Sequence, residues 1–284
     1  IYPNFDLDHP DAVVEGFTSR NANFGAVIHR GAMRNCILSN NNGHNSRGDD
    51  SGFGAGAKMF GGVLTHSRIL DNSVDGTTGV RGGGLYMTGP SRLEYSILSG
   101  NSVGSRMSSA GGGIATDDHF DRPVIRNCLV TDNRVRYRHS SLFAHGGGIF
   151  LGGGRVENTT IANNTAEVLA GYCGAGLYVS SGDVVNTIVY GNRNIDTAID
   201  DADDLQWSAA DESFASHSCA PELTDGPQGN IHNDPKFVDF ETGNYRLMDD
   251  SPCIGTGKTL EWMEANTLDL DGNRRIMAQR VDLG

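Results

Sequence analysis

The side chains best suited to chemistry gather between residues 134 and 146. This stretch, RVRYRHSSLFAHG, holds three arginines, two histidines and a tyrosine, namely Arg134, Arg136, Tyr137, Arg138, His139 and His145. An arginine fork pairs bidentately with carboxylate or sulfate groups, and an aromatic ring offers a flat face for stacking. The cluster therefore suits contact with an acidic polysaccharide.

Two interpretations of this basic cluster are open. If it is catalytic, it fits β-elimination: an arginine would neutralise a uronate, and Tyr137 or His139 would remove the C5 proton. The catalytic set would then be Arg136, Tyr137, Arg138 and His139. Otherwise the loop is solvated and its arginines pair with nearby carboxylates. No GxSxG or HExxH motif offers another reaction.

The acidic turn TDDHFDRP at residues 116–123 is a second candidate. Asp117, Asp118 and Asp121 offer hard oxygen ligands for calcium, or a general acid and base for glycoside hydrolysis. Adjacent carboxylates point to opposite faces of an extended strand, so a paired mechanism needs a partner from elsewhere. The alternative is simple turn chemistry. Calcium is the only cofactor that the sequence suggests.

These residues are embedded in an internal repeat. A glycine-rich block recurs, and its third positions Gly56, Gly84, Gly113, Gly148 and Gly176 are 28, 29, 35 and 28 residues apart. A second block ends each time in an asparagine, at Asn41, Asn72, Asn101, Asn133, Asn164 and Asn192, with spacings of 31, 29, 32, 31 and 28. Six coils are visible.

Short apolar blocks and glycine-rich turns indicate stacked parallel strands rather than helices. Equivalent positions would then form an inward aliphatic column of Leu38, Ile69, Leu98, Val130, Ile161 and Val189, with the asparagines hydrogen-bonded in a ladder. Parallel crossovers are right-handed. We therefore expect an all-β, right-handed parallel β-helix of about six to seven coils over residues 1–220. An irregular C-terminal capping segment at 221–284 should pack on the end of the helix, so that the whole chain forms one continuous domain.

Stacking places the loops that follow each asparagine along one edge of the helix. Neighbouring loops then add His44, Arg47, Arg81 and Arg106 to Arg134 and His145 as substrate-binding residues. The acidic turn at 116–123 belongs to the other bend. The sequence thus predicts two separate candidate sites.

The five cysteines divide by position. Cys36 and Cys128 occupy one repeat column of small residues, so we expect buried free thiols. Cys219 and Cys253 lie outside the repeat, where a disulfide would usefully close the segment between them. That bond would imply an oxidising compartment.

Charge and hydropathy restrict the partners. The formal net charge is −13, and Lys58, Lys236 and Lys258 are the only lysines, which disfavours a general nucleic-acid binder. No run of 18 apolar residues is present to span a membrane. We expect a monomer.

The repeat resembles the right-handed parallel β-helices of the pectate-lyase-like superfamily, particularly bacterial surface proteins with GGGIY…NCxIxxN coils. The tail at 229–257, followed by DLDGNRRIMAQRVDLG at 269–284, is similar to the segment that ends such helices in choice-of-anchor proteins. The resemblance implies export, attachment to a cell surface and a missing N-terminal portion.

Three hypotheses follow for the function. The first is a secreted or cell-surface protein that engages polysaccharide or cell-surface glycan without catalysis. The second is a polysaccharide lyase acting at the arginine-rich edge. The third is a glycoside hydrolase at Asp117–Asp121. The fold alone does not choose among them, but the first is favoured because the sequence has no recognisable lyase signature motif.

Overall fold

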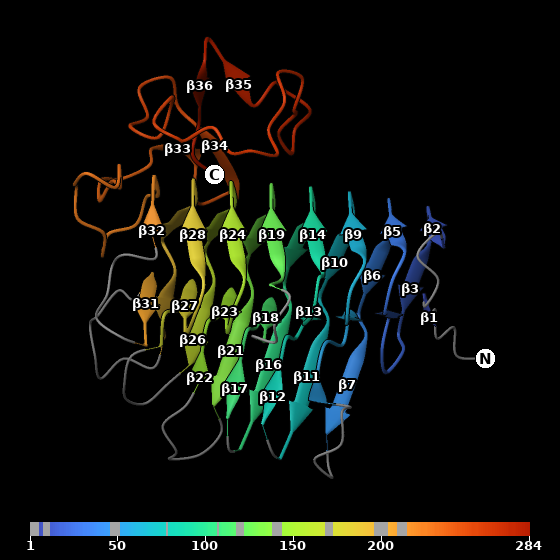
Figure 1. Ribbon diagram of the computed structural model, residues 1–284. Coiled ribbons are helices and arrows are strands. Elements are labelled where there is room, and N and C mark those ends of the chain that lie inside the picture. The colour runs from blue at the N-terminus through green and yellow to red at the C-terminus, as the bar shows by residue number, and fades with distance from the viewer. Residues whose placement is uncertain are drawn as a thin grey trace.

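The computed structural model describes residues 6–7, 12–45, 52–77, 79–106, 108–117, 122–137, 144–167, 173–195, 204–208 and 215–284. The regular structure in these residues is all β, with no α-helix. Strands of two to four residues follow one another around a coil, and the chain advances along the coil axis (Figure 1). The expected all-β parallel β-helix is confirmed.

Within the described residues, two parallel sheets each contain eight strands. Sheet A consists of β1 (Asp6–Leu7), β4 (Ala26–Ile28), β8 (Ala57–Met59), β13 (Leu85–Met87), β18 (Ile114–Thr116), β23 (Ile149–Leu151), β27 (Leu177–Val179) and β31 (Leu205–Trp207). Sheet B consists of β2 (Val13–Glu15), β5 (Ala32–Arg34), β9 (Val63–Thr65), β14 (Arg92–Glu94), β19 (Val124–Arg126), β24 (Arg155–Glu157), β28 (Asp183–Val185) and β32 (Ala215–Ser216).

Three further parallel sheets complete the coil. Sheet C consists of β3 (Thr18–Arg20), β6 (Ile37–Ser39), β10 (Arg68–Leu70), β15 (Ile97–Ser99), β20 (Leu129–Thr131), β25 (Thr160–Ala162) and β29 (Ile188–Tyr190). Sheet D consists of β7 (Asn42–Asn45), β11 (Ser73–Gly76), β16 (Ser102–Ser105), β21 (Arg134–Tyr137), β26 (Thr165–Glu167) and β30 (Arg193–Asn194). Sheet E is short and consists of β12 (Val80–Arg81), β17 (Ser109–Ala110) and β22 (Ala144–His145).

The length of the solenoid differs slightly from the expected six to seven coils. Its six complete coils span about five turns from the first to the last. In the described chain, strands β4–β7 through β27–β30 supply sheets A to D in every coil, whereas the outer strands extend only some of the sheets. The outermost coils are therefore incomplete.

The inward aliphatic column lies as the repeat predicts. Leu38, Ile69, Leu98, Val130, Ile161 and Val189 are consecutive partners across sheet C, and all are fully buried. Burying one such side chain contributes about 1.5–3 kcal/mol relative to exposure. The core is thus continuous from coil to coil.

The asparagine ladder is also formed, at the corner between sheets C and D. The side-chain oxygen of Asn133 accepts bonds from the backbone and side-chain nitrogens of Asn101, at 3.0 and 2.9 Å. Its own amide donates to Asn164 at 2.9 Å. The same pattern joins Asn41, Asn72, Asn101, Asn133, Asn164 and Asn192, all buried.

The corner between sheets B and C needs a left-handed backbone in every coil. The residues there have φ of 45° to 54°, and they are Asn35, His66, Tyr95, Asn127, Asn158, Asn186 and His217. Asparagine is one of the few non-glycine residues that adopt this conformation readily. At the glycine blocks the reason differs: a Cβ on Gly113 would lie 2.7 Å from the carbonyl oxygen of Gly148. Neighbouring coils approach too closely there for a side chain.

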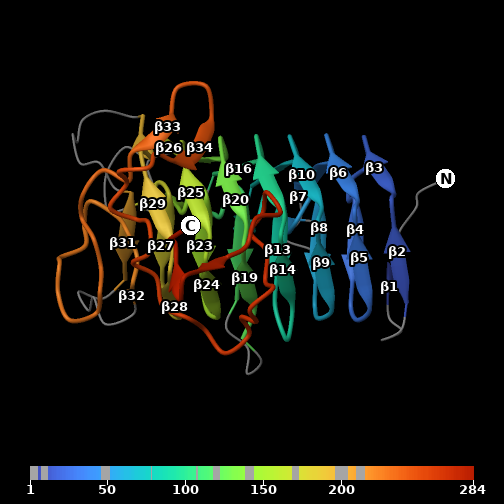
Figure 2. The ribbon, with the colours of Figure 1, turned by 90° about the horizontal axis from the view of Figure 1, so that it is seen from above.

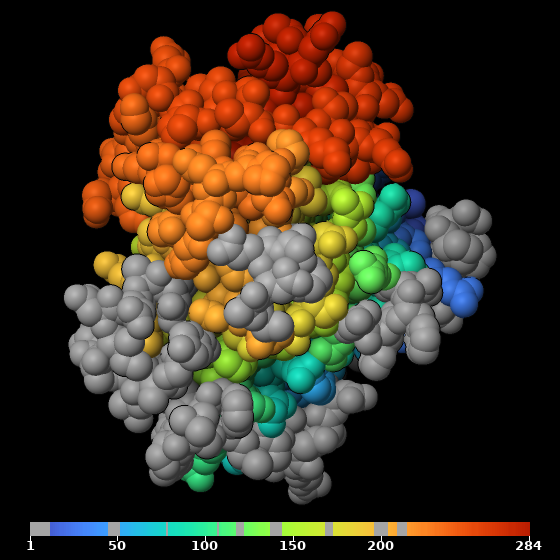
Figure 3. All heavy atoms as spheres, turned by 60° about the vertical axis from the view of Figure 1, so that its left-hand side comes forward, coloured from blue at the N-terminus to red at the C-terminus, as the bar shows by residue number. Residues whose placement is uncertain are grey.

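The C-terminal segment folds back over the solenoid instead of adding coils. It contains two antiparallel pairs, β33 (Phe237–Asp239) with β34 (Asn244–Leu247) and β35 (Ile276–Met277) with β36 (Arg280–Val281). Seen from above, it covers the C-terminal part of the solenoid and leaves β3 and β6 uncovered (Figure 2). In the space-filling view it forms a layer of orange and red atoms above the yellow and green coils (Figure 3).

Candidate functional site

Two candidate residues that the sequence assigns to different bends meet over the outer face of sheet A. Arg81, at the end of β12, forms an ion pair with Asp117, which directly follows β18. The hydroxyl of Tyr86 in β13 donates a hydrogen bond to the other carboxylate oxygen of Asp117, at 2.5 Å. Most strands of sheet A have three residues, about 10 Å, so long side chains reach across it. Contrary to expectation, Arg81 and Asp117 therefore belong to one surface.

Aromatic side chains flank this ion pair along sheet A. The strand register places Tyr86, Ala115, Phe150 and Tyr178 in one column of consecutive coils. The rings of Phe150 and Tyr178 stack with centroids 5.7 Å apart and an angle of 5° between their planes. The alanine leaves an interval between Tyr86 and Phe150, and the guanidinium of Arg81 lies 5.5 Å from the Phe150 centroid.

His145 extends the aromatic surface from sheet E. Its imidazole stacks on Tyr178 with centroids 4.1 Å apart. Burial raises the pKa of the Tyr178 hydroxyl. We call this surface the Tyr86–Tyr178 face, and it comprises Arg81, Tyr86, Ala115, Asp117, His145, Phe150 and Tyr178.

The ion pair on this face is accessible from solvent. The side chains are 40% exposed for Arg81 and 22% exposed for Asp117. Such a pair retains donors on the guanidinium and acceptors on the carboxylate for a ligand. The Tyr86–Tyr178 face thus combines flat apolar rings with a few placed polar groups, as ligand sites do.

The expected arginine cluster lies on sheet D, and a glutamate neutralises part of it. Arg134 and Arg136 both project from β21 toward Glu167 in the next coil, at 2.8 and 3.9 Å. His44 lies in the register column of Arg136, separated from it by two coils. Arg106 is exposed just beyond β16. The structure therefore brings Arg134 and Arg136 together but gives them a shared acidic partner.

Several candidate residues lie outside the described residues. They are Arg47, Asp118, Asp121, Arg138 and His139, together with the side chain of Tyr137. Their catalytic, substrate-binding and calcium-binding roles stay predictions. In the described part of the chain, no group of three or more histidine, cysteine, aspartate or glutamate side chains could hold a metal ion. Among the same residues, no helix is long and apolar enough to cross a membrane.

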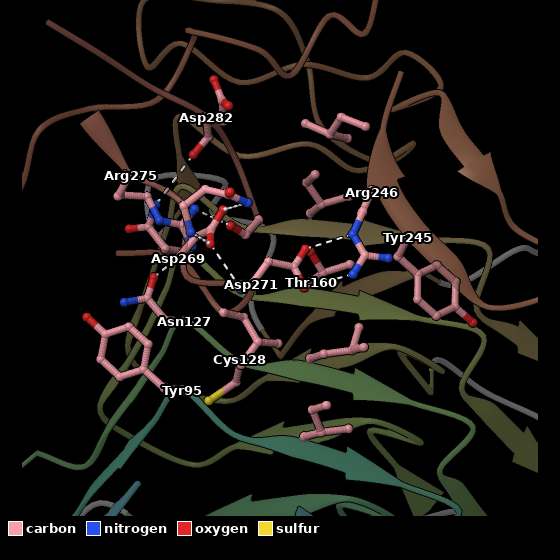
Figure 4. Close-up of a pocket in the computed structure, with 18 of the residues that line it drawn as sticks. Tyr95, Asn127, Cys128, Thr160, Tyr245, Arg246, Asp269, Asp271, Arg275 and Asp282 are labelled. Carbon is pink, nitrogen blue, oxygen red and sulfur yellow. Dashed lines mark hydrogen bonds and ion pairs between the residues drawn. The ribbon is translucent and has the colours of Figure 1, made fainter. Parts of the chain in front are cut away.

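A cleft of about 810 Å³ separates the C-terminal segment from the outer face of sheet C. Its solenoid side includes Ile97, Leu129 and Thr160, and the C-terminal segment supplies the opposite side (Figure 4). This volume is within the range of ligand pockets. The polar groups of the cleft, however, largely bond to one another.

Pairing within the cleft favours a structural role. Arg246 makes a bidentate contact with Asp271, with both distances 2.8 Å. The buried Arg275 donates to the side-chain oxygen of Asn127 at 2.8 Å, and Figure 4 shows it directed at the solenoid. Burial lowers the pKa of Arg275. The cleft is therefore the docking interface of the C-terminal segment.

The cysteines are all free thiols. Cys36 and Cys128 are buried in the solenoid as expected, and burial raises the pKa of Cys128 to about 12. Cys219 and Cys253 belong to one buried cluster between the solenoid and the C-terminal segment, where the Cys219 thiol donates a hydrogen bond to the carbonyl oxygen of Asn233 at 3.2 Å. Their neighbouring positions are compatible with the expected disulfide, which stays a prediction.

Sequence reasoning missed the aromatic residues and the acidic partner of the arginines. The signal for the rings was present in the glycine blocks GGGLYM, GGGIFL and GAGLYV, where Tyr86, Phe150 and Tyr178 occupy the fifth position. That position lies between two inward residues of a strand and must face outward. Glu167 follows the asparagine of its own coil by three residues, and a register alignment would have placed it beside Arg136.

Comparisons with known proteins leave the function to be argued from this geometry. No family model, no curated protein and no solved structure matches the chain. The class that the fold itself defines is a parallel β-solenoid.

Proposed function

We propose that this chain is part of an extracellular, surface-associated protein that binds polysaccharide through the Tyr86–Tyr178 face. The single observation that carries the proposal is the register of Tyr86, Phe150 and Tyr178 on one sheet, beside the accessible pair of Arg81 and Asp117. A row of rings on a rigid sheet supports an extended ligand.

The chemistry of the face matches a carbohydrate. Sugar rings have apolar C–H faces that pack on aromatic side chains, and their hydroxyls both donate and accept hydrogen bonds. Phe150, Tyr178 and His145 provide the apolar surface, while Arg81 and Asp117 provide donors and acceptors. Solenoids commonly present such extended binding surfaces. The extracellular location rests on the resemblance of the repeat to exported β-helix proteins.

The test is binding of soluble polysaccharides to the wild type and to Tyr178→Ala, measured by affinity electrophoresis and calorimetry. Loss of one stacking ring should weaken binding about tenfold or more, equivalent to about 1.4 kcal/mol. Tyr95→Ala is the matched control, because Tyr95 is also a half-buried ring stacked on a histidine, but at the B–C corner. An equal loss of affinity in both variants, or no binding by the wild type, would contradict the proposal.

A polysaccharide lyase is the second candidate, supported by the adjacent Arg134 and Arg136 on β21. Their pairing with Glu167 reduces the positive charge available to a uronate. Incubation with pectate, alginate and glycosaminoglycans, followed by absorbance of unsaturated uronates, tests this candidate. A rise in absorbance that Arg136→Ala abolishes would favour the lyase over the simple binder.

A further inference from the structure

The arginines of the Tyr86–Tyr178 face and of sheet D are paired with carboxylates. Arg81 pairs with Asp117, and Arg134 and Arg136 share Glu167. These are five side chains in two clusters, with three positive and two negative charges. Among the described residues, three arginines of the basic edge that the sequence predicts are thus paired with carboxylates.

A uronate carboxylate would have to compete with these internal partners. The side chains of Asp117 and Glu167 are only 22% and 34% exposed. An incoming carboxylate that took over the arginine would break the ion pair of the internal acid. An incoming carboxylate would also lie near the displaced one, and like charges at short range repel. Binding of an acidic sugar is therefore disfavoured at both clusters.

The net charge of the whole chain also disfavours binding of an acidic polymer. The formal net charge of the whole chain is −13. A negative protein repels a polyanion before contact is made.

A neutral sugar meets none of these obstacles. Its hydroxyls can accept from unused N–H groups of Arg81 and donate to lone pairs of Asp117 while the ion pair stays intact. The tyrosine hydroxyl of Tyr86 already donates to that carboxylate and holds it in place. Aromatic packing on Phe150 and Tyr178 requires no charge on the ligand.

We infer, on the basis of the proposed function, that the ligand of the Tyr86–Tyr178 face is an uncharged polysaccharide. Asp117 acts as the specificity residue of this face, because it occupies the arginine that an acidic polymer would need. Glu167 has the same effect on Arg134 and Arg136 of sheet D. This assignment replaces the acidic polysaccharide that the sequence alone suggests.

The experiment compares neutral polymers (xylan, mannan and β-glucan) with acidic polymers (polygalacturonate, alginate and hyaluronan) at low and physiological salt. The wild type should bind at least one neutral polymer, with an affinity that changes little with salt, and at least about tenfold more tightly than any acidic one. Asp117→Asn keeps the hydrogen-bond acceptor for Tyr86 but removes the charge, so it should gain affinity for acidic polymers. Glu167→Gln should do the same at sheet D.

The outcomes separate the two claims. Preferential, salt-sensitive binding of an acidic polymer that Tyr178→Ala weakens would overturn the neutral ligand and leave polysaccharide binding intact. No binding to any polymer would overturn both. Circular dichroism and thermal unfolding of the two variants show that each is folded, and a folded Asp117→Asn protein without any gain for acidic polymers contradicts the role of Asp117.

Discussion

Asp204 ends the asparagine ladder, because its carboxylate takes the place of the amide group of a next asparagine. One of its carboxylate oxygens accepts from the backbone and side-chain nitrogens of Asn192, at 2.5 and 2.6 Å. The other accepts from the backbone of Gly191 at 3.0 Å. A carboxylate only accepts hydrogen bonds, so this residue satisfies the donors of the last coil without requiring another amide. Glu222 in turn accepts from the backbone nitrogen of Asp204, at 2.7 Å.

The first prediction concerns the pH dependence of stability at this position. Burial, followed by the negative charge of Asp204, raises the pKa of Glu222 to about 7 from 4.5. The folded state therefore holds a proton that the unfolded state releases between these values. The free energy of unfolding should fall as pH rises through this window, by roughly 3 kcal/mol in total from Glu222, and then level off.

Glu222→Gln provides the comparison, because its amide oxygen can still accept from Asp204 while the titration is removed. Urea unfolding at pH 5 and pH 8 should give a smaller loss of stability for Glu222→Gln than for the wild type. The same loss in both proteins would show that Glu222 does not titrate as described.

At the scale of the elements, short strands are held in register by buried polar ladders. No strand exceeds four residues in the described chain, so each has little stability of its own. The asparagine at each C–D corner links its coil to both neighbours and satisfies backbone groups that are buried. Such bonds matter mainly because their loss would leave a buried donor or acceptor unpaired.

The second prediction removes one member of the ladder. Asn133→Ala would orphan the backbone nitrogen of Asn101 and the carbonyl oxygen of Leu98, which Asn133 now contacts at 3.0 Å in each case. Each orphaned group costs about 1–3 kcal/mol. Thr165→Ala, a half-exposed position on β26, serves as control and should change stability by less than about 0.5 kcal/mol. Equal unfolding midpoints for the two variants would contradict the role of the ladder.

At the scale of the whole molecule, the C-terminal segment covers sheets that would otherwise be exposed. Phe237, Cys253 and Leu283 pack with Ile188 of sheet C. Around sheet B, Leu260, Met263 and Val281 pack with Val185, with Trp262 beside them. The ring of Trp262 also lies 4.6 Å from the guanidinium of Arg126. The segment thus attaches to two faces of the solenoid.

The third prediction tests this attachment. Trp262→Ala removes the cation–π contact and part of the apolar cluster, and should destabilise docking by about 2–3 kcal/mol. Limited proteolysis should then cut within residues 221–284 faster than in the wild type, while the solenoid survives. Met277→Ala, at the 62% exposed hairpin residue, is the control. Unchanged cleavage of Trp262→Ala would mean that other contacts dominate the docking.

The fold was largely predictable because a repeat specifies the same local environment several times. One coil with a glycine block and a closing asparagine is a weak signal. Six aligned copies show that Leu98 belongs to the inward-facing column and Asn101 to the corner column. Stacking then follows, since equivalent residues satisfy one another. The C-terminal segment lacks a repeat, and its path over sheets B and C could not be deduced.

The candidate site was predicted only in part. Arg81 and Asp117 were each identified as candidates, but their pairing depends on the short distance across sheet A, which the repeat does not specify. Likewise, the pairing of Arg134 and Arg136 with Glu167 arises from register between coils.

The amino-acid sequence by itself determined the strands, their parallel stacking, the aliphatic column and the asparagine ladder, because these depend on side-chain periodicity within and between neighbouring coils. Only the tertiary structure decided which charges neutralise one another and which rings share a face. Those relations depend on how far side chains reach across corners of the coil, because the attraction between two charges weakens strongly when their distance grows by a few ångströms.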